Sequence, residues 1–123
     1  MDYNEITKAV VSASFEVHKN LGPGLLESVY QKCLIQELRL KGFECRENAP
    51  VKVVYKGVEL EKCFFIDVLV NEQVLIELKA VELVLPVHKA QLLSYLKLSN
   101  KKIGLLINFN VPLLKDGITR CIN

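Results

Sequence analysis

Apolar residues recur at helical spacing in the first third of the chain, at Ile6, Val10, Ala13 and Val17. This spacing predicts a first helix from Asn4 to Lys19, and Asp2 with Glu5 forms a helix-start signal. A second helical pattern runs from Leu26 to Leu38 and ends at Lys41-Gly42. Two consecutive helices therefore open the predicted fold.

The rest of the chain is rich in β-branched and aromatic runs separated by turn signals. Strands are expected at Val51–Tyr55, Val58–Leu60, Phe64–Val70, Val74–Lys79 and Ile103–Phe109. A turn at Lys56-Gly57 separates the first two strands, and a helix from Pro86 to Leu98 precedes the last. The order helix, helix, several strands, helix, strand predicts an α/β sandwich with a mixed β-sheet flanked by helices.

One predicted hairpin carries charged residues that are candidates for a functional site. If Asn71-Glu72-Gln73 is a three-residue connection, Val70 pairs with Val74, and Asp67 then lies opposite Glu77. Their Cβ atoms would be roughly 5 Å apart, where like charges repel unless a cation or a proton lies between them. Lys79 projects from the same face. The pattern indicates a divalent-metal site with a lysine beside the bound water.

Two alternatives compete with this interpretation. A one-residue slip would turn the acids to opposite faces, and acids and lysines also alternate on solvated strand faces. The apolar neighbours argue against a solvated face. Phe65, Leu69 and Leu75 would share the face of the acids, and the other face would carry Phe64, Ile66, Val68 and Ile76. Charges placed among apolar neighbours need a partner.

Four segments carry a resemblance to a known family. Ile66-Asp67, nine residues and then Glu77-Leu78-Lys79 resemble the core motif of the PD-(D/E)XK nuclease superfamily, with Ile66 in place of its proline. The segment Gly24 to Tyr30 resembles the signature of the GxxExxY proteins. Gln91 to Tyr95 resembles the QxxxY element of RecB-like nucleases, and Ile103–Phe109 the strand after it. The resemblance covers nearly the whole chain and implies a restriction-endonuclease-like αβββαβ core.

The resemblance also implies roles for the acids and the lysine. Asp67, Glu77, the Leu78 carbonyl and Glu27 would hold one or two Mg or Mn ions, and Lys79 would orient water or stabilise the transition state. Glu27 is expected to point inward, because Tyr30 lies one turn later on the same helix face. An acid in a first helical turn also has a simpler explanation, since it complements the helix dipole.

Further residues are implied in supporting positions. Gln91 would lie near the lysine or the scissile phosphate, with Tyr95 packed behind it, and Tyr30 would be a supporting hydrogen-bond donor. His88 shares a helix face with Gln91 and Tyr95. A polar edge on an amphipathic helix explains the three equally well, and a histidine near a helix start is often a cap or a surface residue.

Composition fits a single domain over residues 1–123, because half of the residues are hydrophobic and the chain can bury one core. No apolar run approaches the roughly 20 residues that span a bilayer, and the N-terminus lacks signal-peptide features. A cytoplasmic protein without a membrane partner is therefore expected. The cysteines are widely spaced and are interpreted as reduced thiols: Cys33, Cys45, Cys63 and Cys121.

Together these features favour a metal-dependent nuclease. The net charge of +2 and the scattered lysines neither support nor exclude nucleic acid. The QxxxY resemblance favours DNA and exonuclease-like action. The small size suggests that a homodimer or a protein partner supplies the rest of the substrate-binding surface. One alternative is a catalytically silent nuclease-fold module for nucleic-acid or protein binding. Another is an enzyme acting on a small phosphorylated molecule, although Gly22-Pro23-Gly24 lacks the features of a phosphate-binding loop.

Overall fold

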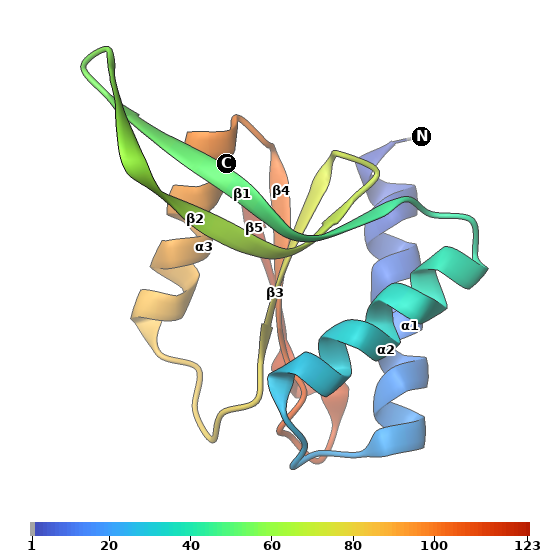
Figure 1. Ribbon diagram of the computed structural model, residues 1–123. Helices are drawn as coiled ribbons and strands as arrows, with labels where there is room; N and C mark the ends of the chain where they lie inside the picture. Colours follow the sequence, from blue (N-terminus) through green and yellow to red (C-terminus); the bar gives the residue numbers. More distant parts are fainter. Residues whose placement is uncertain (1) are drawn as a thin grey trace.

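The computed structural model describes residues 2–123, except for the side chain of Lys62. Over these residues the chain forms three α-helices, one 3-10 helix and one five-stranded sheet (Figure 1). In chain order the elements are α1 (Tyr3–Leu21), α2 (Glu27–Leu40), β1 (Cys45–Tyr55), β2 (Val58–Val70), β3 (Val74–Lys79), α3 (Pro86–Ser99), β4 (Ile103–Asn108), η1 (Leu114–Gly117) and β5 (Ile118–Ile122).

The strands follow one another across the sheet in the order β1-β2-β3-β4-β5. All neighbours are antiparallel except β3 and β4, which are parallel and are joined through α3. The sheet is therefore mixed, and β3 lies at its centre. This arrangement confirms the predicted α/β fold with a restriction-endonuclease-like αβββαβ core, to which the structure adds α1 and β5.

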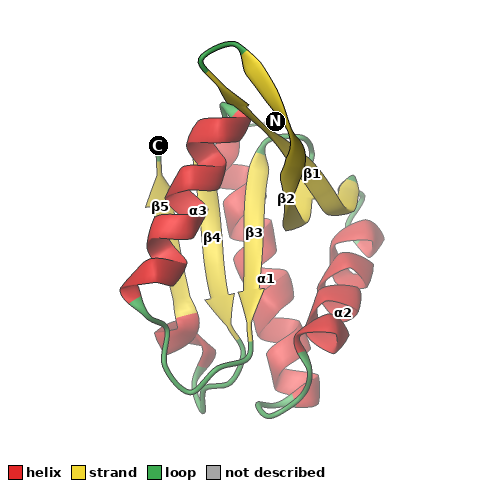
Figure 2. Ribbon diagram, turned by 60° about the vertical axis from the view of Figure 1, so that its left-hand side comes forward, coloured by secondary structure: helices red, strands yellow, loops and turns green. Residues whose placement is uncertain are grey.

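Helices cover both faces of the sheet, with α1 and α2 on one face and α3 on the other (Figure 2). The larger core lies under α1 and α2 and includes Ile6, Tyr30, Leu34, Ile76 and Ile107. The smaller core lies under α3 and includes Leu69, Leu75, Leu92, Leu96 and Leu106. Because apolar side chains meet β3 from both faces, a polar group within this strand, such as Glu77, is enclosed.

The predicted helices are confirmed with small changes at their ends. Asp2 caps α1 as expected, since its Oδ1 accepts a hydrogen bond from the Glu5 N–H at 2.9 Å. Within residues 2–123, none of the helices is both long and apolar enough to cross a membrane. The four cysteines are free thiols, and Cys121 is the buried one among them.

The strands differ more from expectation. β1 begins at Cys45, six residues before the expected start, and β2 is one long strand where two were expected. The turn at Lys56-Gly57 is present, and both residues have positive φ angles, as a tight two-residue hairpin requires. β5 was not anticipated, because Ile118–Ile122 alternates too briefly and is interrupted by polar residues.

The predicted side-chain faces of β2 are also partly wrong. Val68 and Val70 pack under α1 and α2, whereas Ile66 packs on the α3 face with Leu69. Alternation along the strand therefore shifts near Asp67. Asn48 lies in the neighbouring stretch of β1 with a φ of 51°, so β1 too departs from regular strand geometry at this point.

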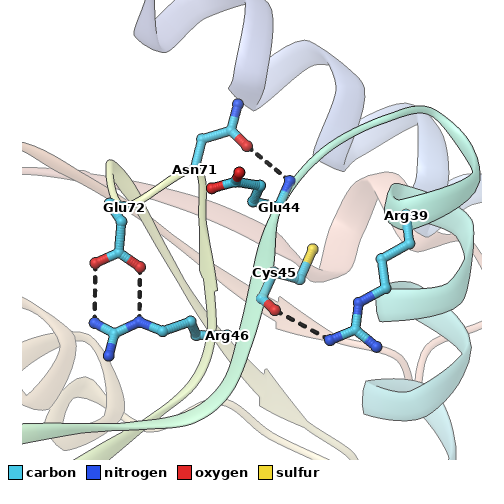
Figure 3. Close-up of polar contacts among 6 residues, drawn as sticks. All are labelled: Arg39, Glu44, Cys45, Arg46, Asn71 and Glu72. Carbon is cyan, nitrogen blue, oxygen red and sulfur yellow. Dashed lines mark hydrogen bonds and ion pairs between the residues drawn. The ribbon is translucent and has the colours of Figure 1, made fainter.

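Polar contacts fasten the β2–β3 turn to the start of β1 (Figure 3). The Asn71 side-chain oxygen accepts a hydrogen bond from the Glu44 N–H at 2.8 Å. Arg46 makes a two-pronged ion pair with Glu72, at 2.6 and 3.0 Å. These contacts hold the turn that sets the register of β2 against β3.

Candidate active site

The two acids of the predicted hairpin lie side by side where β2 and β3 separate. The strands pair Val70 with Val74, as the sequence predicted, and the last regular pair is Val68 with Ile76. Beyond that pair, carboxylates replace the main-chain ladder. The Asp67 N–H donates to Glu77 Oε1 at 3.2 Å, and the Leu78 N–H donates to Asp67 Oδ2 at 2.7 Å.

Burial makes this pair electrostatically unfavourable in its fully ionised form. Glu77 is only 6% exposed, and burial together with the Asp67 charge raises its pKa to about 8. Burial also raises the pKa of Asp67, although the hydrogen bond from the Leu78 N–H acts in the opposite direction. Without a cation, the pair therefore retains a proton at neutral pH.

Lys79, Glu27 and Tyr95 lie close enough to this pair to interact with it electrostatically. The positive charge of Lys79 lowers the pKa of both acids, whereas the negative charge of Glu27 raises it. Burial raises the pKa of Tyr95, and the charges of Glu77 and Asp67 add to that effect. Residues from α2, β2, β3 and α3 thus converge at one end of the sheet.

Glu27 does not point inward as expected. It is the first residue of α2, and its side chain is exposed, whereas Tyr30 is fully buried. The start of α2 lies at the lower end of the molecule in Figure 1, and Glu27, Ser28 and Val29 are all exposed there. Glu27 therefore contributes charge to the site from its rim.

Tyr30 organises the loop that leads into Glu27. Its hydroxyl donates to the Gly22 carbonyl at 2.6 Å and accepts from the Leu25 N–H at 3.1 Å. Its ring stacks on Phe109 with centroids 4.5 Å apart. The Tyr30 hydroxyl therefore bonds to the backbone of the loop before Glu27, and its expected role in supporting the metal site stays a prediction.

The three polar residues of α3 have different environments. His88 caps the helix, because its Nδ1 accepts from the Leu85 N–H at 3.0 Å. Gln91 is exposed on the helix surface. Tyr95 is buried against Phe64, with ring centroids 5.1 Å apart, and is the member of the three that feels the charges of the acids.

Gln31 is a positioning residue that sequence reasoning missed. Its Nε2 donates to the Asp67 carbonyl at 2.9 Å and to the Asn48 side-chain oxygen at 3.0 Å. One amide therefore links α2, β1 and the backbone of Asp67 at the point where β2 is irregular. Its position four residues after Glu27 was the available signal, because such residues share a helix face.

Asn108 is a second missed residue, at the end of β4 opposite Lys79. Its side chain is 2% exposed and brackets Val81, accepting from its N–H at 3.1 Å and donating to its carbonyl at 2.8 Å. The chain just beyond Lys79 is thereby fixed. A polar residue at the end of the otherwise apolar run Ile103–Phe109 was the signal for this role.

The donor set fits a hard divalent cation. Among the described residues, no three acid, histidine or cysteine side chains are close enough to form a ligand group. The site therefore offers the carboxylates of Asp67 and Glu77, to which the predicted Leu78 carbonyl would add a third oxygen. Mg²⁺ is commonly bound through one or two carboxylates, with water and phosphate oxygens completing the shell. The mutual repulsion of the buried acids is what a cation would relieve.

The pKa of Glu77 predicts a specific dependence of stability on pH. Because its folded-state pKa is raised from 4.5 to about 8, the contribution of Glu77 to the free energy of unfolding should be largest below pH 4.5 and be lost as pH rises toward 8. Glu77→Gln removes this titration and should stabilise the metal-free protein at pH 7 by on the order of 2 kcal/mol. Urea unfolding with a chelator, from pH 4 to 8, measures the difference. Parallel curves for the two proteins would contradict the assignment, and the variant Glu61→Gln, at an exposed position on β2, should follow wild type.

Tyr30→Phe should loosen the loop before Glu27 while leaving the ring stack intact. The variant loses the hydroxyl that joins Gly22 to Leu25, at a cost of about 1–2 kcal/mol in the free energy of unfolding. Amide exchange at Leu25 should accelerate as well. Tyr3→Phe, at an exposed position on α1, is the matched control and should change neither quantity.

Comparison with known proteins agrees with this geometry. The family model of the PD-(D/E)XK nuclease superfamily matches residues 4–121. Neither the curated proteins nor the solved structures give a match to the chain. The matched range contains both acids, the lysine and every strand from β1 to β4, and the chain belongs to the PD-(D/E)XK nuclease superfamily.

Proposed function

We propose that this protein is a divalent-metal-dependent nuclease that hydrolyses phosphodiester bonds in DNA, with Mg or Mn as its metal. The observation that carries the proposal is the buried pair of Asp67 and Glu77, in which Glu77 accepts from the Asp67 N–H and Asp67 accepts from the Leu78 N–H, with Lys79 beside them. The superfamily supports hydrolysis of phosphodiester bonds. DNA as the substrate and Mg or Mn as the metal are the further parts of the proposal.

Asp67, Glu77 and the Leu78 carbonyl would hold the metal, and Glu27 would add a third negative charge from the rim. A bound divalent ion supplies an acidified water and offsets the negative charge that develops on the phosphate. Binding replaces the proton that the carboxylate pair otherwise retains. The pair must therefore lose that proton before it can act as a ligand set.

Lys79 would supply the positive charge beside the reacting phosphate. It is half-buried at the end of β3, and Phe109 and Asn108 fix the backbone around it. A positioned ammonium group can orient the attacking water and stabilise the negative charge of the transition state. Gln31 would hold Asp67 in place through the Asp67 carbonyl.

The more specific assignment is to the GxxExxY proteins and the RecB-like branch. Gly24, Glu27 and Tyr30 match the GxxExxY signature, and in the structure Tyr30 ties down the loop in which Gly24 lies. Gln91 and Tyr95 match QxxxY, and Tyr95 lies within the field of the acids. This resemblance supports DNA as the substrate and cleavage from an end.

The alternative is a catalytically silent module that binds nucleic acid or protein. Gln91 is exposed and His88 serves as a helix cap, so α3 offers few polar groups directed at the acids. The presence of both acids and the lysine favours the enzyme. Cleavage assays decide between the two.

The test is cleavage of labelled linear and circular DNA, single- and double-stranded, with Mg²⁺ or Mn²⁺. Glu77→Ala and Lys79→Ala should each reduce cleavage by at least about 100-fold, because each removes a group that acts on the transition state. Lys79→Ala should keep metal binding, and Glu77→Ala should lose it. The control Glu61→Gln changes an exposed acid on the same strand as Asp67 and should retain full activity.

Preference for linear DNA would establish end-dependent action. Cleavage that persists in purified Glu77→Ala protein would overturn the proposal. Inactivity of wild type and all variants toward every substrate would favour the silent module.

A further inference from the structure

The β1–β2 hairpin forms an arm that projects beyond the rest of the sheet (Figures 1 and 2). We define the arm as residues 52–65. Its tip lies away from the end of β3 where the acids are, in both views. The arm is thus separate from the candidate active site, and the inference drawn from it does not depend on the proposed function.

Large apolar side chains are exposed along the arm. Their exposed fractions are between 43% and 63%, and they are Val54, Tyr55, Val58, Leu60, Phe64 and Phe65. Tyr55, Val58, Leu60 and Phe64 lie on one face of the arm, whereas Val54 and Phe65 lie on the other, because Tyr55 pairs with Val58 and side chains alternate along each strand. Taking roughly 150–200 Å² for each side chain, the first face presents on the order of 400 Å² of apolar surface. This is within the range of the largest patch on a typical monomer, and such patches are often interaction sites.

We propose that the arm is a dimerisation surface, and that its partner is the arm of a second copy of this chain. A stable interface of ordinary size takes about 800 Å² from each partner, of which slightly more than half is apolar. The exposed apolar surface of the face that carries Tyr55, Val58, Leu60 and Phe64 approaches that share. Two arms related by a two-fold axis would therefore cover each other's apolar residues.

The charges of the arm favour a copy of itself over nucleic acid. Lys52 forms an ion pair with Glu59 at 3.0 Å, and the Lys56 ammonium lies 5.5 Å from the centre of the Tyr55 ring. Both signs are present, and these two lysines already have partners on the arm. A phosphate backbone would instead require a concentrated basic surface, whereas a surface with both signs can meet itself without net repulsion.

The contact is between side-chain faces and not between strand edges. β1 is an edge strand of the sheet, but Pro50 lacks an N–H and the register shifts between Lys52 and Val54. Both features interrupt the ladder that a further strand would need. Tyr55 pairs with Val58 across the hairpin, so the two side chains share one face. That face is the centre of the proposed contact.

The experiment is sedimentation equilibrium with light scattering across a wide range of protein concentration. Wild type should move from 13.9 kDa to twice that mass as concentration rises. The double substitution Tyr55→Ser and Val58→Ser should weaken the dimer by more than about tenfold. Leu40→Ser is the matched control, because Leu40 is an exposed leucine on α2 and should leave the dimer unchanged.

A wild-type protein that stays monomeric at the highest concentration would overturn the proposal, as would a dimer that the double substitution leaves intact. Hydrogen exchange of wild type alone provides a test that needs no variant. Protection of residues 52–60 should rise with protein concentration, and protection that does not change with concentration would contradict the arm as the contact.

Discussion

The structure depends on the enclosure of two like-charged carboxylates at the point where β2 and β3 separate. Apolar layers cover both faces of β3, and Glu77 is nearly inaccessible within them. An ionised carboxylate in such a place is costly unless hydrogen bonds or a cation offset its charge. Hydrogen bonds meet part of that need, because Glu77 accepts from the Asp67 N–H and Asp67 accepts from the Leu78 N–H. The remaining deficit favours a proton on the pair, and it is the reason that we propose a metal ion at this site.

Surrounding residues hold this arrangement in place from several elements. Gln31 reaches from α2 to the Asp67 carbonyl, and Asn108 fixes the chain beyond Lys79. Tyr30 ties the loop before Glu27 while it packs on Phe109. Each of these groups makes at least one hydrogen bond to a backbone atom, so together they set where the acids and the lysine lie. The apolar cores supply the stability that offsets the cost of burying the acids.

The sequence predicted the parts that follow from local patterns. Hydrophobic periodicity located the helices, and the three-residue connection was enough to set the register that brings Asp67 next to Glu77. Register is well specified here because a one-residue slip of β3 would move Glu77 and Lys79 into the apolar core under α1 and α2. The spacing of Asp67, Glu77 and Lys79 along the chain is itself local, so the chemistry of the site could be inferred together with the hairpin.

The parts that were missed depend on contacts between segments distant in the chain. Gln31 bonds to a residue 36 positions away, and no local pattern encodes that contact. The irregularity of β2 near Asp67 moved Ile66 to the α3 face, which simple alternation cannot foresee. Glu27 was expected to point inward from helical spacing alone, but the position of its turn at the end of the molecule leaves it exposed.

The most direct measurement of the central claim is calorimetric titration of the metal-free protein with Mn²⁺ at pH 7, repeated in buffers with different heats of ionisation. Because the pKa of Glu77 is about 8, binding to the acid pair should release close to one proton for each metal bound. Glu77→Ala should abolish both the binding and the proton release. Binding of Mn²⁺ without proton release, or binding that survives in Glu77→Ala, would contradict the account.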